Sequence, residues 1–265
     1  GFPLLNRTKK GVTLTERGRE VFSAAQAIVA RYDQMLRQIS ALKEDSTEVI
    51  SGKMNVHTSP MISVCILPVV YVDYKHNFPK VQLFCQERYQ DDIVKEVSEH
   101  PGDVGYVLVA NTLKHFFNNI PDNVELSLLN TYPIYMAMSP RHPLARQHTL
   151  SLQSIKDYPL IIYEAGGIQG EHALQNEVDM HILLSTNNTN MTKELLNEGN
   201  ALMYSYPPYV TRGAFPECVH IPLHTKNIFF ELYMVHNKDA NQQQRRLIDS
   251  KTAFSSHKDR HEKLG

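Results

Sequence analysis

The chain begins with the stretch GFPLLNRTKKGVTLT over residues 1–15 and continues as a long amphipathic pattern to residue 44. Residues 6–14 are typical of two short strands around a basic tip, because Gly11 permits the backbone conformation that a tight hairpin needs. A basic hairpin can lie along a DNA duplex and neutralise phosphates, which gives affinity without sequence readout. The residues predicted to contact the DNA backbone are Arg7, Thr8, Lys9 and Lys10.

Charge is unevenly distributed along the chain. Its net charge is −1, yet the first 19 residues carry the bases Arg7, Lys9, Lys10, Arg17 and Arg19 against the single acid Glu16. The remainder is therefore net acidic. This asymmetry favours a nucleic-acid contact confined to the amino-terminal end, and a solvated basic turn is the alternative.

Residues 16–44 have the pattern of a dimerisation helix. Thr15 stands where a helix N-cap belongs, and Glu16 is favourable beside the helix dipole. Apolar residues then recur with a period of 3.5, which is typical of a seam between two helices. The second helix is expected to come from another copy of the chain, and packing against its own chain is the alternative. Residues 45–52 are predicted to be a linker. The predicted seam is Val21, Ala25, Ile28, Tyr32, Met35, Ile39 and Leu42.

The hairpin, the Leu14-Thr15-x-x-Gly18 step and the long helix resemble the LysR-type transcriptional regulators. In that family a winged helix-turn-helix is joined by a linker helix to an effector-binding domain. The resemblance implies that residues 1–15 are the remnant of a wing and that the helices entering the major groove would precede Gly1. The chain alone is therefore expected to bind operator DNA poorly, because base readout needs those helices.

From Lys53 onward, strand-like and helix-like segments alternate, which predicts an α/β fold with a mainly parallel sheet. The steps Val81-x-Leu83-x-x-x-Glu87 and Asp103-Val104-Gly105 and the loop 139–145 also resemble the family. The resemblance implies a two-lobed, periplasmic-binding-protein-like effector domain over residues 53–250. Lobe I is expected at about 53–109 and 207–250 and lobe II at about 110–206, with the chain crossing near 109–110 and within 186–206. Residues 251–265 form a polar tail.

The effector is expected in a cleft at the carboxyl ends of strands. Thr58 and Ser59 follow a predicted strand and offer hydroxyls and free amides, which favours a carboxylate or another anion. Ordinary helix capping is the alternative for these two residues. The resemblance places effector contacts at Thr58, Ser59, Pro60, Met61, Arg88, Ser139, Glu164, Gly166, Thr186 and Asn187.

Nothing in the sequence recommends catalysis, a metal or a cofactor. The 13 histidines are scattered, and no motif for nucleophilic, metal-dependent or nucleotide-dependent chemistry is present. Cys65, Cys85 and Cys218 are an odd number and widely spaced, which favours reduced thiols in a cytoplasmic protein. No apolar run of about 18 residues exists, so no membrane span is predicted.

These patterns together predict a transcriptional regulator that is not an enzyme. A small molecule binds its effector domain and alters the geometry of a homodimer or homotetramer on promoter DNA. One alternative is a solute-binding protein of the periplasmic type, which shares the two lobes but gives the hairpin and the helix no role. A less favoured alternative is an enzyme on the same fold.

Overall fold

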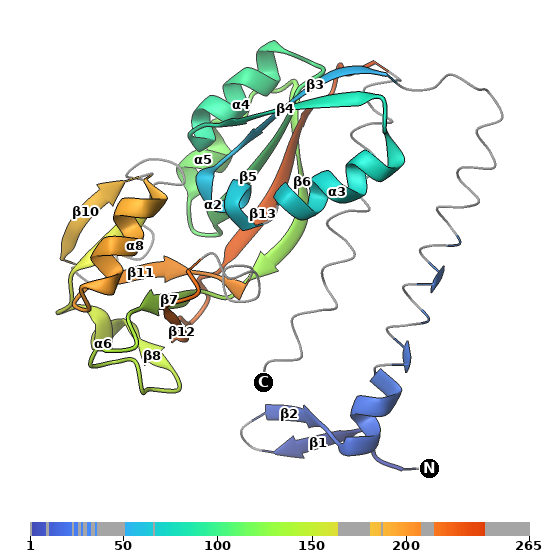
Figure 1. The fold of residues 1–265 in the computed structure, drawn as a ribbon. Coiled ribbons are helices and arrows are strands. Elements are labelled where there is room, and N and C mark those ends of the chain that lie inside the picture. The colour runs from blue at the N-terminus through green and yellow to red at the C-terminus, as the bar shows by residue number, and fades with distance from the viewer. Residues whose placement is uncertain are drawn as a thin grey trace. The chain divides into compact units, whose positions relative to one another are not determined.

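The computed structural model describes residues 2–8, 11–22, 24–25, 28, 31–32, 35, 51–65, 67–163, 181–186, 188–207 and 215–241. The chain divides between residues 49 and 50 into two units (Figure 1), and each is described by itself. Several predictions lie outside the described residues. They are those for Lys9, Lys10, Ile39, Leu42, Glu164, Gly166, Asn187, the linker residues 45–50 and the tail 251–265.

The first unit contains the predicted hairpin. Strand β1 (Leu5–Thr8) pairs with β2 (Gly11–Leu14) in antiparallel register, from Leu5 opposite Leu14 to Thr8 opposite Gly11. Helical residues follow at 16–22, 24–25, 28, 31–32 and 35. The hairpin and the start of the predicted helix are thus both confirmed.

Thr15 joins the hairpin to the helix. Its Oγ1 accepts a hydrogen bond from the Gly18 amide at 2.8 Å and donates one to the Pro3 carbonyl at 2.9 Å. A Cβ on Gly18 would lie 2.0 Å from the Leu4 carbonyl oxygen. Glycine is therefore required here by the close approach of the two main chains, which explains the spacing of the Leu14-Thr15-x-x-Gly18 step.

The second unit begins with a five-stranded sheet in the order β4-β3-β5-β13-β6. Strands β3, β4 and β5 are parallel, and β13 is antiparallel to both β5 and β6. The bounds are β3 Gly52–Thr58, β4 Val81–Glu87, β5 Val104–Ala110, β6 Val124–Tyr132 and β13 Phe230–Asn237.

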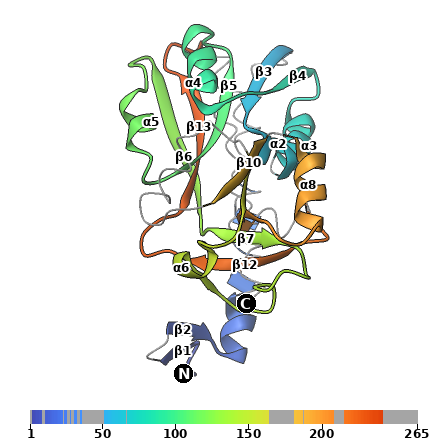
Figure 2. The same ribbon diagram turned by 90° about the vertical axis from the view of Figure 1, so that its left-hand side faces the viewer.

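Helices cover both faces of this sheet (Figure 2). Helices α2 (Pro60–Cys65) and α3 (Leu67–Asn77) lie on one face, and α4 (Gln90–Glu99) and α5 (Lys114–Asn118) lie on the other. All seven residues of β5 are buried, as expected for a strand covered on both faces. In β3, Met54 and Val56 belong to the apolar cluster shared with α2 and α3, so Asn55 and His57 face α4.

A second sheet of six strands follows the order β10-β9-β11-β7-β12-β8. Within it β9, β10 and β11 are parallel, while β7 runs antiparallel to β11 and β12. Helix α6 (Leu152–Ile155) packs near β8, and helix α8 (Thr189–Asn197) packs near β9. The bounds are β7 Tyr135–Met138, β8 Leu150–Ser151, β9 Leu160–Tyr163, β10 Ile182–Thr186, β11 Leu202–Ser205 and β12 Val219–His224. The two sheets confirm the predicted two-lobed α/β fold.

The chain passes between the sheets at other places than the predicted crossings near 109–110 and within 186–206. It leaves the first sheet after β6 and returns between β12 and β13. The segment after β5 folds back on the first lobe, because Leu113 and Phe116 are buried against α4 and β5. The returning segment is held at Asn111, whose Nδ2 donates to the Asn227 carbonyl at 2.9 Å. Compared with the prediction, lobe I therefore gains β6, and lobe II gains β12.

Candidate functional site

The carboxyl ends of parallel strands form one edge in each sheet. In the first sheet, Thr58 at the end of β3 lies opposite Glu87 at the end of β4. In the second sheet, Thr186 at the end of β10 lies opposite Tyr163 at the end of β9, and β11 ends at Ser205 beside them. Ligands of open α/β sheets bind at such edges, where loops and helix starts converge.

Tyr206 joins the two edges. Its hydroxyl donates a hydrogen bond to the Met61 carbonyl at 2.9 Å, and its ring packs edge-on against Tyr132 with centroids 5.4 Å apart. Burial, together with the neighbouring Cys65 and Tyr132, raises the pKa of Tyr206 well above its usual range. The phenol is therefore a neutral donor that connects lobe II to the start of α2.

Thr58 and Ser59 are fully buried at this junction. The Ser59 carbonyl accepts hydrogen bonds from the amides of Ile62 and Ser63, both at 3.0 Å. The Ser59 hydroxyl is buried with no hydrogen-bond partner among the described residues. An unsatisfied buried hydroxyl costs roughly 1–3 kcal/mol, so a polar ligand group at this point would recover part of that cost.

The ten residues predicted to contact the effector do not all come together. Thr58, Ser59, Pro60 and Met61 lie at the junction and are buried, and Thr186 lies at the corresponding carboxyl edge of the second sheet. Ser139 does not. It follows Met138, which pairs with Leu202 at the amino end of β11, so about 13 Å of strand separates it from that edge. Ser139 lies away from that edge because β7 runs antiparallel to β11.

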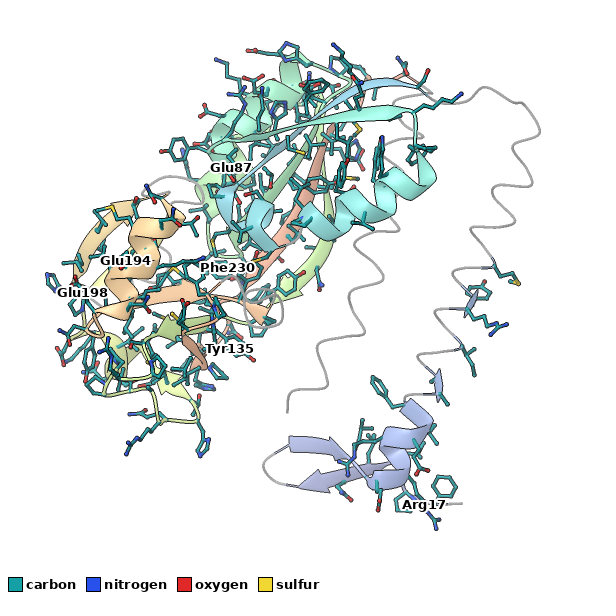
Figure 3. All side chains as sticks on the ribbon, in the orientation of Figure 1. Arg17, Glu87, Tyr135, Glu194, Glu198 and Phe230 are labelled. Carbon is teal, nitrogen blue, oxygen red and sulfur yellow. The ribbon has the colours of Figure 1, made fainter. Side chains whose placement is uncertain are left out.

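Figure 3 shows Tyr135 and Phe230 close to the passage between the sheets. Tyr135 begins β7 opposite Ser205, at the edge that faces lobe I. Phe230 begins β13 and packs against the apolar clusters of both lobes. Tyr135, Phe230 and Tyr206 were not predicted as part of the site. The direction of each strand decides which residues reach this edge, and sequence periodicity does not give that direction.

Arg88 reaches the junction through its main chain only. Its amide donates to the Thr58 carbonyl at 3.0 Å. Its guanidinium instead lies under α4, where Nε donates to His57 Nδ1 at 3.2 Å and Nη2 donates to Gln86 Oε1 at 2.7 Å. Nη2 also lies 3.4 Å from Glu96 Oε1. The side chain of Arg88 thus points to α4, and only its main-chain amide contacts the residues at the junction.

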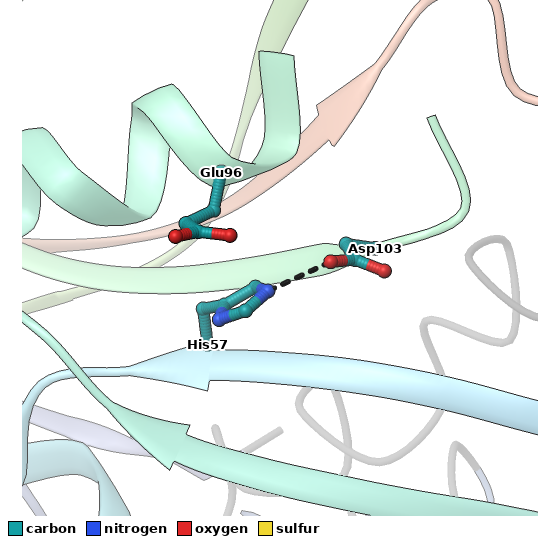
Figure 4. Close-up of side chains that lie close together, drawn as sticks. All are labelled: His57, Glu96 and Asp103. Carbon is teal, nitrogen blue, oxygen red and sulfur yellow. Dashed lines mark hydrogen bonds and ion pairs between the residues drawn. The ribbon is translucent and has the colours of Figure 1, made fainter. Parts of the chain in front are cut away.

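His57 and Asp103 form a buried pair beside Arg88 (Figure 4). His57 Nε2 lies 2.9 Å from Asp103 Oδ2, and Asn55 Nδ2 donates to Asp103 Oδ1 at 2.9 Å. Because the guanidinium is always protonated, Arg88 must donate and His57 Nδ1 must accept. The proton of the neutral ring is therefore on Nε2 and is donated to Asp103. Sequence reasoning missed this pair.

The ligating atoms of His57, Glu96 and Asp103 all lie within 4.8 Å of one another, which raises the question of a metal ion. A metal ligand on histidine must be an unprotonated nitrogen. Arg88 fixes the proton on Nε2, the nitrogen that faces the carboxylate, and its own charge lies beside Glu96. The geometry of this group therefore favours a hydrogen-bonded charge network over a metal site.

The first unit carries the predicted dimerisation and DNA-contact residues that the structure describes. Val21, Ala25, Ile28, Tyr32 and Met35 are all exposed, with Ile28 at 70%. Arg7 and Thr8 lie in β1, directly before the hairpin tip. These apolar side chains are thus not covered by the described residues of the first unit.

No helix among the described residues is both long and apolar enough to cross a membrane.

A model of the family described as the LysR substrate binding domain matches residues 47–250. Similar proteins include the HTH-type transcriptional regulator CzcR of Bacillus subtilis, 26% identical over 164 residues, which are 62% of this chain and 49% of that protein. The HTH-type transcriptional activator CmpR of Synechocystis is 21% identical over 69% of this chain and 58% of its own length. The chain thus spans about half the length of these relatives.

Solved structures share the fold. The LysR family transcriptional regulator CbnR has a TM-score of 0.62 at 14% identity, covering 94% of this chain and 84% of that one. The oxidised form of OxyR also has a TM-score of 0.62 at 14% identity, covering 81% of this chain and 99% of that one.

Proposed function

Because the chain belongs to the LysR substrate binding domain family, we propose that it is the sensing part of a DNA-binding transcriptional regulator in the cytoplasm. The relatives named above are transcriptional regulators, and CbnR has been solved in complex with its target DNA. These likenesses support regulation over catalysis. They also disfavour a periplasmic solute-binding protein, in which the hairpin and the exposed helical stripe would have no role.

The observation that carries the sensing proposal is the buried hydroxyl of Ser59, which follows the carboxyl end of β3 and has no hydrogen-bond partner in the described part of the chain. A small effector with a carboxylate or another hydrogen-bonding anion would accept from Ser59 and Thr58 on lobe I and from Thr186 on lobe II. Binding across both lobes favours one relative arrangement of the lobes. A ligand shifts such an equilibrium only by its difference in affinity for the two arrangements.

The test is a thermal-shift screen of the whole chain against small organic anions. A ligand present at about 100 times its Kd adds about 2.7 kcal/mol of stability. For any hit, Ser59→Ala and Thr186→Ala should weaken binding, each by roughly tenfold for the loss of one hydrogen bond. Ser139→Ala is the matched control at the opposite edge and should leave the Kd unchanged. Equal weakening by all three changes would contradict the proposed position of the site.

We also propose that the basic hairpin contacts DNA phosphates. Arg7 and Thr8 lie in β1, next to the tip that carries Lys9 and Lys10 in the sequence. Replacing Lys9 and Lys10 with alanine in the full-length regulator should weaken binding equally for operator and unrelated DNA. The slope of log K against log salt should fall by about one for each phosphate that the variant no longer neutralises. Weakening restricted to operator DNA would contradict this role.

A further inference from the structure

The charge network under α4 is connected to the proposed effector site by the main chain. Arg88 belongs to both: its guanidinium is bonded to His57, Gln86 and Glu96, and its amide is bonded to the Thr58 carbonyl. Thr58 precedes Ser59, whose hydroxyl carries the sensing proposal. Arg88 therefore links the charge network to the main chain that carries Thr58 and Ser59.

The arrangement depends on where one proton lies. With His57 neutral, Nδ1 accepts from Arg88 and Nε2 donates to Asp103. A second proton on the ring would occupy Nδ1, remove the acceptor and place an imidazolium 3.2 Å from a guanidinium. The His57–Asp103 bond would persist as an ion pair, because both partners would then be charged. Protonation thus breaks the bond to Arg88 and keeps the bond to Asp103.

The groups that face His57 set the balance of charge. Asn55 lies on its own strand, Gln86 and Arg88 come from β4 and the residue after it, and Asp103 comes from the start of β5. Glu96 lies on α4, and His100 at the end of that helix is 3.7 Å from it. With His57 neutral the network holds one cation and two carboxylates, so a proton on His57 neutralises it. Protonation is therefore compatible with burial of the pair, and Arg88 is the group that must move.

We propose that His57 and Asp103 are positioning residues for the effector site, acting through Arg88, and that the proton on His57 Nδ1 switches this positioning off. This inference rests on the proposed sensing function for its consequence, but the switch itself is a property of the charge network.

The direct test follows Arg88 in the whole chain by NMR, with 15N-labelled arginine and histidine. The pH is lowered in steps until the chain begins to unfold, and the protonation of His57 Nδ1 is followed directly. The Arg88 Nε–H resonance should shift with the same midpoint. Hydrogen exchange at the Arg88 amide, corrected for its intrinsic pH dependence, should accelerate roughly tenfold as the bond to Thr58 loosens.

His57→Gln provides the decisive variant, because an amide offers one acceptor and one donor but does not titrate. In H57Q the Arg88 signals should no longer respond to pH. His100→Gln is the matched control, since His100 is exposed and contacts only Glu96 of this network; its pH response should equal that of the wild type. If H57Q fails to fold, the NMR experiment on the wild type still tests whether the Arg88 signals follow the protonation of His57.

Two results would overturn the switch: a His57 ring that stays neutral down to acid unfolding, or Arg88 signals that ignore its protonation. A screen in which no organic anion binds would remove the sensing proposal and leave the NMR result standing. The two failures are therefore distinguishable.

Discussion

His142 is a buried residue whose ring packs on Tyr158, with centroids 4.6 Å apart, and whose Nδ1 accepts from the Leu144 amide at 3.1 Å. Burial lowers its pKa from the usual 6.5, and the main chain of Asn200 opposes this shift in part. Below about pH 6.5 the unfolded chain takes up a proton that the folded chain refuses. Its contribution to stability is therefore complete above that pH and decreases as the pH falls toward the folded-state pKa.

We expect His142→Asn to flatten this dependence, because asparagine can accept from Leu144 without titrating. The free energy of unfolding in urea, compared at about pH 7.5 and about pH 5.5, should fall more in the wild type than in H142N. The difference is bounded by about 1.4 kcal/mol per pH unit for one proton. The poorer ring packing lowers the stability of H142N at both pH values and cancels in this comparison. Identical decreases in both proteins would contradict the prediction.

Single residues divide into those that sequence could identify and those that it could not. The place of Thr58 and Ser59 between a strand and a helix was predictable, because a hydroxyl pair before a proline is a local signal for a helix start. The His57–Asp103 bond was not, since 46 positions separate its partners and its formation depends on β3 and β5 becoming neighbours. The place of Ser139 could not be predicted for a related reason, because it depends on the direction of β7.

At the scale of elements, α4 packs closely on β5 because Gly105 has no side chain. A Cβ there would lie 2.4 Å from Ile93 Cγ2 and 3.1 Å from Val235 Cβ. Gly105→Ala should therefore destabilise the second unit by about 1–3 kcal/mol, the usual cost of overpacking a core. Urea unfolding measures this cost. Ile93→Leu, which removes the obstructing methyl, should cost less than about 1.5 kcal/mol alone and recover part of the stability in the double variant. Strictly additive effects would show that the clash is not the cause.

Helix α8 begins at a side-chain cap. Asn188 Oδ1 accepts from the Met191 amide at 3.0 Å, which satisfies one of the free amides of the first turn. Asn188→Ala should cost about 1 kcal/mol. Asn190→Ala is the control on the same helix, where the residue is exposed and alanine has the higher helix propensity. Urea unfolding should rank N188A below the wild type and N190A at or above it, and the reverse order would refute the cap.

The alternation of strand-like and helix-like segments predicted from Lys53 onward is confirmed by β3, α2, α3, β4, α4 and β5, which follow one another in the chain. The exception with most consequence is β6, which sequence reasoning did not predict. Its nine residues do not alternate between buried and exposed positions, since it is an edge strand paired on one side with β13. Because β6 was not predicted, the first crossing between the lobes was expected near residues 109–110, before β6 instead of after it. Lobe I was therefore predicted without this strand.

At the scale of the whole molecule, the apolar stripe of the first unit concerns assembly. A stripe of exposed apolar side chains that includes Ile28, 70% exposed, and Tyr32, 55% exposed, needs a partner, and the 3.5-residue period favours the same helix of a second copy. Each buried isoleucine contributes about 1.5–3 kcal/mol. In a two-fold dimer Ile28→Glu loses that contribution twice and introduces two carboxylates into the seam.

We therefore expect I28E to sediment as a monomer at micromolar concentration, where the wild type is at least a dimer. Arg19→Glu, on the opposite side of the helical residues, changes the charge more but should leave the mass of the assembly unchanged. The midpoint of thermal unfolding for residues 50–264 should be similar in both variants, because those residues form a separate unit. An unchanged assembly in I28E would mean that copies associate through another surface, and the helix would then have to cover its stripe within its own chain.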